Sequence, residues 1–292
     1  MLSPAFTNYL NLQLSRFFGD ELMISRVKPV GGGCINKAFC LISNKAKFFL
    51  KYNNATSYPG MFETEHKGLN LLHSTQSIHV PQPYFTGVFE NNSFIIIEYI
   101  ESTARQADFW EQFAGNIAAM HRNRAASYGL DYDNYIGSLK QENTLRADWV
   151  DFFINYRIEP QLNLAFNANL INKPLLSKFS ALHKRLADIF PEEQPALLHG
   201  DLWSGNFTVN SRGEPSIFDP AVYYGHREME LAYTQLFGGF HSTFYSAYQQ
   251  YYPVEKGFEK RKDYYNLYPL LVHVNLFGTS YLQQINSILR QF

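Results

Sequence analysis

Three side chains that carry oxygen stand at short, fixed intervals in the second half of this 292-residue chain. Asp201 is followed after four intervening residues by Asn206, and Asp219 comes thirteen residues further on. An aspartate can orient an acceptor hydroxyl, while an amide and a second carboxylate can hold Mg²⁺ against the phosphates of a nucleotide. The spacing therefore predicts a phosphoryl-transfer site, with Asp201 as the catalytic base and Asn206 and Asp219 as metal ligands.

Two apolar runs favour this interpretation over a simple capped turn, in which Asp and Asn are also common. Residues 196–198 lead into the Asp201 loop, and residues 216–218 lead directly into Asp219. Short apolar runs bounded by turn residues are typical of strands. We expect two strands that present these polar groups at a shared end.

A nucleotide site of this kind also needs groups that hold phosphate, and the first sixty residues offer them. Gly31, Gly32 and Gly33 allow a tight turn and a close approach of backbone N–H groups to phosphate. Lys51 ends the apolar run 48–50, in the manner of the lysine with which kinases hold the α- and β-phosphates. Three adjacent glycines are also an ordinary hairpin turn, and neither the Walker spacing nor a full G-x-G-x-x-G pattern is present.

A carboxylate should pair with this lysine, and the helical pattern of residues 61–72 offers Glu63 and Glu65. When the apolar residues of the segment lie on one helical face, Glu65 is nearer to that buried face than Glu63. We therefore expect Glu65 to form the ion pair with Lys51.

The run 93–100 is rich in β-branched residues and too short to cross a bilayer, so it predicts a buried strand. In a two-lobed kinase the end of such a strand contacts adenine through its main chain. Glu98, Tyr99 and Ile100 are the candidates for this contact. An ordinary central strand accounts for the same pattern.

The composition indicates a soluble globular enzyme. Hydrophobic residues make up 46% of the chain and charged residues 17%, which excludes a disordered protein. The formal net charge of -1 gives no general electrostatic reason to bind nucleic acid or an anionic membrane. The N-terminus lacks the positive-then-apolar pattern of a secretion signal, so we expect a cytoplasmic protein.

The two cysteines, Cys34 and Cys40, are too few for a disulfide framework, and the nine scattered histidines give no zinc-ligand spacing. This usage fits a reducing compartment. Cys34 stands beside the glycines, where backbone N–H groups could favour its thiolate, so oxidation of Cys34 is one hypothesis. A small loop residue without redox chemistry is the alternative.

Strand patterns give way to helical patterns near residue 100, where we place the boundary between two lobes. Apolar residues recur at helical spacing over 109–120, 149–156 and 267–276. The sequence thus predicts an α+β protein, with a small antiparallel-sheet N-lobe over 1–100 and a larger, mostly helical C-lobe over 101–292.

Several segments together resemble the fructosamine kinase (ketosamine-3-kinase) family, a relative of aminoglycoside and choline phosphotransferases in the protein-kinase-like superfamily. The resemblance covers nearly the whole chain. It rests on Gly-Gly-Cys-Ile-Asn at 32–36, Asn-Tyr-Ile-Gly at 134–137 with Gln141 and Asn143, the segment 149–157, Pro-Gln-Leu at 160–162, His-Gly-Asp-Leu-Trp-Ser-Gly-Asn at 199–206, and the segment 219–228. Trp203, the run 236–240 and residues 268–278 separate this family from its antibiotic-modifying relatives.

The resemblance implies a two-lobed kinase-like fold and ATP-dependent phosphorylation of the 3-hydroxyl of a ketosamine. A ketosamine is the adduct that forms when a sugar condenses with an amine and rearranges. In the family the 3-phosphate makes the adduct unstable, so that it loses phosphate and frees the amine, which would be a deglycation or repair reaction. The implied cofactors are ATP and Mg²⁺, and the implied partner is a small-molecule or protein-bound ketosamine. The family's functional positions match Asp201 as base, Asn206 and Asp219 as metal ligands, and Lys51 with Glu65 as the phosphate clamp.

Three further residues are candidates for contacts with the acceptor. Trp203 lies two residues after the base and could stack on a sugar or on an amine-bearing arm, or pack beneath the loop instead. His226 and Glu228 follow the Asp219 loop and could shape the acceptor pocket or merely hold it. We expect Arg227, between them, to belong to the scaffold.

The chain departs from the family pattern at Glu230, where an aspartate is expected before Leu-Ala. The extra methylene would matter little at the surface but would disturb a tight hydrogen bond. We expect the chemistry to survive, with acceptor selectivity or loop rigidity the properties most open to change.

Two other functions stay open. One is a kinase for another small alcohol, such as an aminoglycoside, choline or a sugar, and the other is a catalytically silent kinase-like binding module. The silent module is disfavoured because Lys51, Glu65, Asp201, Asn206 and Asp219 are all present. The preferred ketose and amine stay open as well, and we expect a monomer or a weak dimer.

Overall fold

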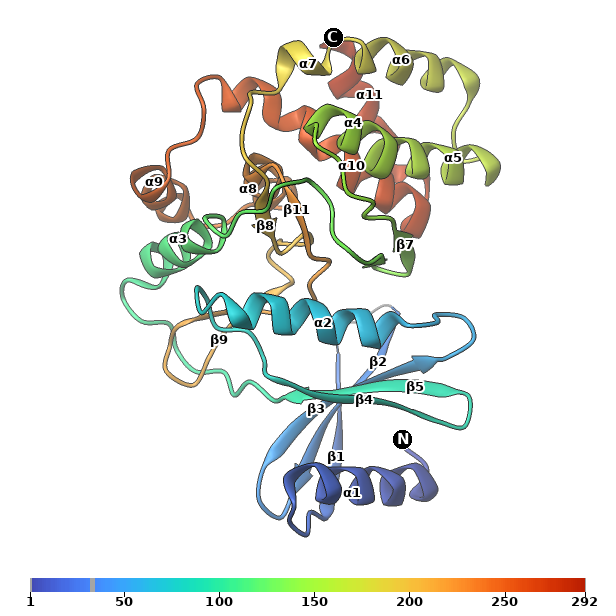
Figure 1. Ribbon diagram of the computed structural model, residues 1–292, viewed down its shortest axis with the longest axis vertical. Helices are drawn as coiled ribbons and strands as arrows, with labels where there is room; N and C mark the ends of the chain where they lie inside the picture. The colour runs from blue at the N-terminus through green and yellow to red at the C-terminus, as the bar shows by residue number, and fades with distance from the viewer. Residues whose placement is uncertain (1, 32–34, 292) are drawn as a thin grey trace.

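The computed structural model describes residues 2–31 and 35–291, and it places a small sheet region beside a larger helical region (Figure 1). The sheet has five strands in the order β1-β2-β3-β5-β4, and all neighbouring strands are antiparallel. The strands are β1 (Ile24–Val30), β2 (Lys37–Ser43), β3 (Lys47–Asn54), β4 (Pro83–Phe89) and β5 (Asn92–Glu98). The antiparallel sheet predicted for the first hundred residues is confirmed.

Two helices cover the two faces of this sheet (Figure 1). Helix α1 (Pro4–Phe18) starts at Ser3, whose hydroxyl accepts a hydrogen bond from the Phe6 amide at 3.1 Å and satisfies one of the helix's first free N–H groups. Its buried side packs on one face of the sheet. Helix α2 (Met61–Ser74) lies on the other face, between the sheet and the helical region. The sheet is therefore covered on the side that faces the rest of the molecule.

The larger region has helices arranged around three short antiparallel strand pairs. The pairs are β6 (Asn134–Ile136) with β7 (Leu139–Gln141), β8 (Ala196–Leu198) with β11 (Tyr223–Gly225), and β9 (Phe207–Val209) with β10 (Pro215–Ile217). The helices are α3 (Phe109–Met120), α4 (Trp149–Phe153), α5 (Glu159–Asn167), α6 (Lys173–His183), α7 (Leu186–Ile189), α8 (Arg227–Leu236), α9 (Ser242–Tyr251), α10 (Phe258–Phe277) and α11 (Leu282–Arg290), with a 3₁₀ turn at Thr279–Tyr281. The predicted α+β fold is confirmed.

The helix expected over 149–156 is interrupted. α4 ends at Phe153, and Ile154–Ile158 form a π-helix, a feature that accommodates an extra residue and so escapes a search for a period of 3.6. The π-helix carries Arg157, whose guanidinium is fully buried 3.9 Å from the centroid of the Tyr223 ring. The interruption thus puts a cation at the centre of the helical region.

The chain leaves the sheet after β5, at Glu98, and the next helix begins at Phe109, so the change in secondary structure falls where the sequence places it. The hydrophobic core does not stop there. One cluster joins residues of α2 and β5 to the helical region, while a second lies between α1 and the sheet. The division into lobes over 1–100 and 101–292 stays a prediction.

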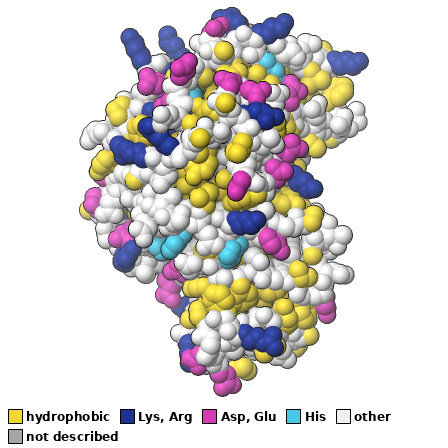
Figure 2. Space-filling view, viewed as in Figure 1, with side chains coloured by type: hydrophobic (Ala, Val, Ile, Leu, Met, Phe, Trp, Pro, Cys, Tyr) yellow, Lys and Arg dark blue, Asp and Glu magenta, His cyan; other side chains and the backbone are white. Residues whose placement is uncertain are grey.

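The surface shows mixed charge. On the face drawn in Figure 2, Lys and Arg side chains are interspersed with Asp and Glu side chains. Within residues 2–31 and 35–291, no helix combines the length and the apolar character that a membrane span requires.

Candidate active site

The loop between β8 and β9 carries Asp201 and Asn206, and the loop after β10 carries Asp219. β8 and β10, which lead into these loops, do not pair with each other. β8 pairs with β11, and β10 pairs with β9. Main-chain hydrogen bonds join the loops instead, from Ala221 N to His199 O at 2.9 Å and from Phe218 N to Asn206 O at 3.1 Å. The predicted base and metal ligands are therefore held in one rigid unit.

Gly200 is the point of closest approach between these loops. Its φ of 84° is in the left-handed region, and a Cβ atom at this position would lie 2.0 Å from the carbonyl oxygen of Ala221. A side chain would separate the two loops, so the position beside Asp201 requires glycine.

The Asp201 carboxylate accepts two hydrogen bonds. Tyr233 donates its hydroxyl to Oδ1 at 2.8 Å, and Asn206 donates Nδ2 to Oδ2 at 2.9 Å. Burial raises the pKa of Asp201 to about 7, although these two hydrogen bonds lower it. A carboxylate with a raised pKa beside a nucleotide site is suited to accept a proton from a hydroxyl.

Asn206 is oriented by the same contacts. Its Nδ2 donates both to the Asp201 carboxylate and to the Asp201 carbonyl oxygen, at 2.9 and 2.8 Å. The nitrogen end of the amide is thus engaged, and the oxygen end is the one left to face a metal. This arrangement fits the role predicted for Asn206.

Lys51, Glu65 and Asp219 meet at a second point of the site. Lys51 Nζ lies 2.6 Å from Glu65 Oε1 and also pairs with the Asp219 carboxylate. Burial disfavours the charged form of Lys51, but the Asp219 and Glu65 carboxylates outweigh it and raise the pKa of the lysine. Glu63, the other candidate, is exposed on α2, so Glu65 alone of the two forms the ion pair.

The donor set fits Mg²⁺. The ion takes few protein oxygens because it keeps water and phosphate ligands, so the Asn206 amide and the Asp219 carboxylate form a sufficient protein share. Among the described residues, no group of three or more His, Cys, Asp or Glu side chains could hold a metal. Asp219 has a φ of 57°, a conformation uncommon for aspartate that persists here because Phe218 before it and Ala221 two residues after it are bonded across the loops.

The structure describes the candidates for adenine contact, Glu98, Tyr99 and Ile100, but only part of the glycine run. The Glu98 N–H donates to Gln82 O at 2.9 Å within the sheet, so an adenine contact by Glu98 would have to use its carbonyl group. Tyr99 and Ile100 follow the end of β5, where the chain leaves the sheet. Gly31 has open space where a Cβ would lie, while Gly32, Gly33 and the redox candidate Cys34 fall outside the described residues.

Comparison with known proteins decides the family. A family model for fructosamine kinase matches residues 7–292. The chain belongs to the fructosamine kinase family. A protein of Synechocystis named "probable ketoamine kinase" is 40% identical, and the match covers 99% of this chain and 97% of that protein. The protein-ribulosamine 3-kinase of Oryza sativa subsp. japonica, named as chloroplastic, is also 40% identical over 94% of this chain and 80% of its own.

Solved structures agree with this family and its fold. A crystal structure from Haemophilus somnus named "putative fructosamine-3-kinase" superimposes with a TM-score of 0.88 at 30% identity, and the match covers 97% of this chain and 96% of that one. The ternary complex of an aminoglycoside phosphotransferase APH(4)-Ia mutant gives a TM-score of 0.67 at 15% identity, over 96% and 98% of the chains. The second likeness shows that this chain shares the fold of an aminoglycoside phosphotransferase.

The family segment Asn-Tyr-Ile-Gly supports the chain that follows Asp219. Asn134 donates to Val222 O at 2.8 Å, and Gln141 donates to Ala221 O at 3.1 Å. Tyr268 in turn donates to Gln141 Oε1 at 2.6 Å. Asn134 and Gln141 therefore support the chain that follows Asp219.

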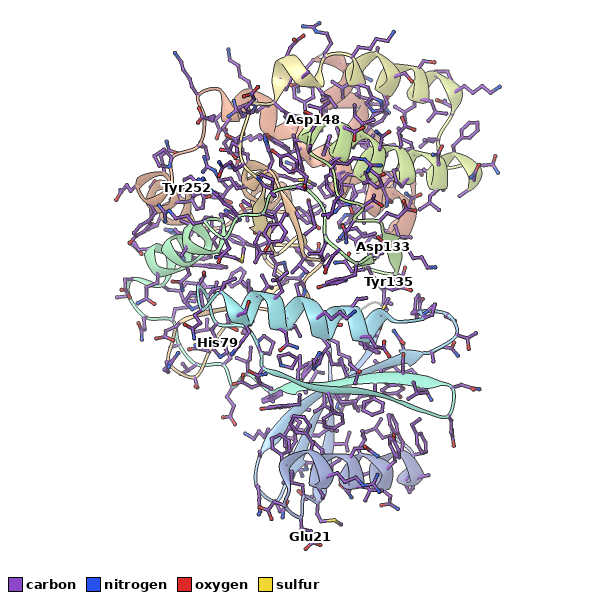
Figure 3. All side chains as sticks on the ribbon, in the orientation of Figure 1. Glu21, His79, Asp133, Tyr135, Asp148 and Tyr252 are labelled. Atoms are coloured by element: carbon purple, nitrogen blue, oxygen red, sulfur yellow. The ribbon has the colours of Figure 1, made fainter. Side chains whose placement is uncertain are left out.

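The same segment also reaches the sheet region. The Tyr135 hydroxyl donates to Pro59 O at 2.9 Å, just before α2, and Figure 3 shows Tyr135 between α2 and the helices. The segment thus connects the chain that follows Asp219 with the start of the helix that carries Glu65.

Trp203 lies over its own loop. A Cβ on Gly205 would come within 2.4 Å of the Trp203 ring, and the ring meets Phe237 edge-on at 6.4 Å. The indole is only partly buried, so packing leaves part of it accessible. Its contact with the acceptor stays a prediction.

His226 and Glu228 are not brought to this site. Both side chains are fully buried in the helical region. His226 stacks on Trp149 at a centroid distance of 4.8 Å, and Glu228 pairs with Arg261 at 2.5 Å. Of the two roles predicted for them, shaping the acceptor pocket or merely holding it, their burial fits the second.

Arg227 is buried as well. It pairs with Glu193 at 2.7 Å and lies 3.7 Å from the centroid of the Tyr252 ring. These contacts fit the scaffold position expected for it.

Glu230 does not lie at the surface: it is buried and makes tight hydrogen bonds. Its Oε1 accepts from Gly200 N at 2.8 Å, and its Oε2 lies 2.9 Å from His121 Nε2. Burial raises the pKa of Glu230, but the bonds from His121 and Gly200 outweigh it and the net shift is downward. The longer side chain thus spans two partners and holds the catalytic loop.

Tyr233 was missed by the sequence analysis. A tyrosine in a helix carries no signal of its own, since its ring accounts for its burial equally well. The one available clue was its place three residues after Glu230, which puts both side chains on the same side of α8.

Proposed function

We propose that this protein transfers the γ-phosphoryl group of MgATP to the 3-hydroxyl of a ketosamine and thereby initiates deglycation of an amine. The observation that carries the proposal is the joint presence of the Lys51–Glu65–Asp219 cluster and the Asp201–Asn206 pair in a chain that the fructosamine kinase family model matches over residues 7–292. Relatives named ketoamine kinase and protein-ribulosamine 3-kinase support the substrate class. The ternary complex of APH(4)-Ia with AMP-PNP and hygromycin B supports ATP as the donor.

The residues divide the work between donor and acceptor. Lys51, held by Glu65, binds the α- and β-phosphates, and Asn206 and Asp219 would hold the metal. Bound Mg²⁺ would neutralise charge on the transferring phosphoryl group. Asp201 orients the acceptor hydroxyl in line with that group and accepts its proton, so catalysis rests on positioning and charge rather than on a covalent intermediate.

Trp203 is proposed to contact the sugar or the amine-bearing arm, because it follows the base and remains partly open. Glu98, Tyr99 and Ile100 are proposed to contact adenine through the main chain. Gly31, Gly32 and Gly33 are proposed to cover the phosphates. A monomeric or weakly dimeric state and a cytoplasmic location also stay predictions.

The deciding experiment measures ADP release from MgATP with ribuloselysine, erythruloselysine, fructoselysine, kanamycin and choline. The Asp201→Asn protein is the blank, and a parallel reaction with EDTA tests the need for the metal. We expect turnover with one or more ketosamines, absent from the blank and from the EDTA reaction. Turnover with kanamycin or choline alone would overturn the deglycation role, and MgATP binding without turnover would point to a binding module.

A further inference from the structure

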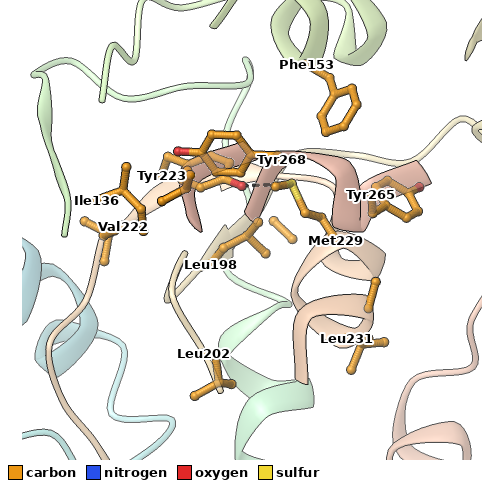
Figure 4. Packing of buried hydrophobic residues seen from close by; sticks show 14 of the residues in the cluster. Ile136, Phe153, Leu198, Leu202, Val222, Tyr223, Met229, Leu231, Tyr265 and Tyr268 are labelled. Carbon is orange, nitrogen blue, oxygen red and sulfur yellow. Dashed lines mark hydrogen bonds between the residues drawn. The ribbon is translucent and has the colours of Figure 1, made fainter. Parts of the chain in front are cut away.

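Helix α8 directs two polar side chains at the catalytic loop from below. Glu230 bonds the loop backbone at Gly200, and Tyr233, one turn further along, bonds the carboxylate of Asp201 itself. Figure 4 shows buried hydrophobic residues of this region, among them Leu198 and Leu202 on either side of the Gly200–Asp201 turn and Leu231 on α8. The contact of Tyr233 with the base therefore lies at the boundary of a packed core.

The two hydrogen bonds on Asp201 differ in what they join. The bond from Asn206 connects the carboxylate to a neighbour in the same loop, and that neighbour is itself the proposed metal ligand. The bond from Tyr233 connects Oδ1 to a separate element 32 residues away. Tyr233 can thus fix the rotation of the carboxylate independently of the loop and of what Asn206 binds.

Tyr233 is held firmly enough for this task. It is only 7% exposed, and its ring meets the Phe237 ring at 6.1 Å. The helix is bound to α10 by the Glu228–Arg261 pair and by a bond from Asn266 to Ala232 O at 3.1 Å. A hydroxyl on so well anchored a helix has little freedom to follow the carboxylate.

We propose that Tyr233 is the positioning residue of the base: its hydroxyl fixes Asp201 Oδ1 so that a free lone pair of the carboxylate faces the acceptor hydroxyl. This inference rests on the proposed phosphoryl transfer with Asp201 as base. The hydroxyl of Tyr233 donates to Asp201, so we expect Tyr233 to act on the rate of transfer and not on nucleotide binding. The ring of Phe237 also links Tyr233 to Trp203, because it contacts both rings.

The test compares Tyr233→Phe with Tyr245→Phe. Tyr245 is a matched control, since its hydroxyl bonds Thr234 O and Phe240 N near the same end of α8 without contacting Asp201. For Tyr233→Phe we expect kcat to fall by about 10- to 100-fold, the scale of a misplaced catalytic group, with unchanged KM for MgATP and unchanged Tm. Tyr245→Phe should keep the wild-type kcat.

A second comparison isolates the route through the base. In the Asp201→Asn background, Tyr233→Phe should cause no further loss of kcat, because the group it positions is already disabled. A kcat for Tyr233→Phe within twofold of wild type would overturn the inference. So would an additional loss in the double variant, or a fall in kcat matched by an equal fall in Tm and MgATP affinity.

Failure of the proposed function gives a different result. If the wild-type protein phosphorylates an alcohol that is not a ketosamine, the substrate proposal is wrong. The ratio of kcat between wild type and Tyr233→Phe, measured with that alcohol, still decides the role of Tyr233.

Discussion

The phosphate clamp and the catalytic loop are both built from buried polar side chains, but they are held in different ways. In the clamp, Lys51 is bound directly by two carboxylates from two other elements. In the loop, Asp201 has no cation beside it among the described residues and is held by the neutral donors Tyr233 and Asn206. The clamp is thus assembled by charge and the base by hydrogen-bond direction.

This difference follows from the two tasks. Phosphate binding needs a cation whose charge survives burial, and adjacent carboxylates secure it. A base must stay able to take up a proton, which a neighbouring cation would oppose by lowering its pKa. The neutral donors that orient the Asp201 carboxylate also lower its pKa, but burial outweighs them, and the pKa of Asp201 remains raised.

The largest effect should come from Asp201→Asn, which keeps the shape of the side chain and removes its basicity. We expect kcat to fall by about 10²- to 10⁴-fold, the usual share of a general base, with MgATP affinity unchanged. Rapid-mixing kinetics together with calorimetric titration of MgATP would measure both quantities. A variant with wild-type kcat would remove Asp201 from the role of base.

Substitution in the phosphate clamp should change the KM for MgATP, whereas substitution of Asp201 changes kcat. Glu65→Ala leaves Lys51 with Asp219 as its carboxylate partner, so the lysine is drawn away from the phosphates and KM for MgATP rises by about 10-fold or more. Glu63→Ala is the matched control, because Glu63 is an exposed glutamate on the same helix. Equal effects of the two substitutions on the KM for MgATP would show that the Lys51–Glu65 pair has no part in nucleotide binding.

The same contrast explains which parts could be predicted from the sequence. Lys51 was predictable because it ends an apolar run, Glu65 because it lies near the buried face of its helix, and Asp219 because it follows an apolar run at a fixed interval after Asn206. Tyr233 was not, because a tyrosine fits a buried helix with or without its hydroxyl bonded. His226 and Glu228 show the converse. Their polar character suggested contacts at an acceptor pocket, whereas both side chains are buried in the helical region. The sheet followed from apolar and β-branched runs, while the π-helix at Ile154–Ile158 left no periodic trace.

A smaller effect is expected at Glu230, which holds the loop that carries Asp201. Glu230→Asp restores the residue expected in the family pattern, but a side chain one methylene shorter cannot reach both Gly200 N and His121 while the backbone stays in place. One buried partner is left unpaired, which costs about 1–3 kcal/mol of the free energy of unfolding.

Urea unfolding measures this loss, and Glu111→Asp, an exposed glutamate in the first turn of α3, is the control. Unchanged stability of Glu230→Asp would mean that the backbone of α8 moves towards the loop. The catalytic loop would then be less rigidly placed than its hydrogen bonds indicate.

The smallest effect should appear on the acceptor side. Gly205→Ala introduces a methyl group within 2.4 Å of the Trp203 ring, and since the ring is partly exposed it can turn aside at little cost to stability. If Trp203 stacks on the acceptor, KM for the ketosamine rises about 2- to 5-fold, the equivalent of roughly 0.5–1 kcal/mol of aromatic contact, while KM for MgATP stays unchanged. Ser204→Ala, at the exposed neighbouring position, should leave both constants as they are. An unaltered KM for the ketosamine in Gly205→Ala would assign Trp203 to loop packing alone, and the acceptor would then be held by groups other than the Trp203 ring.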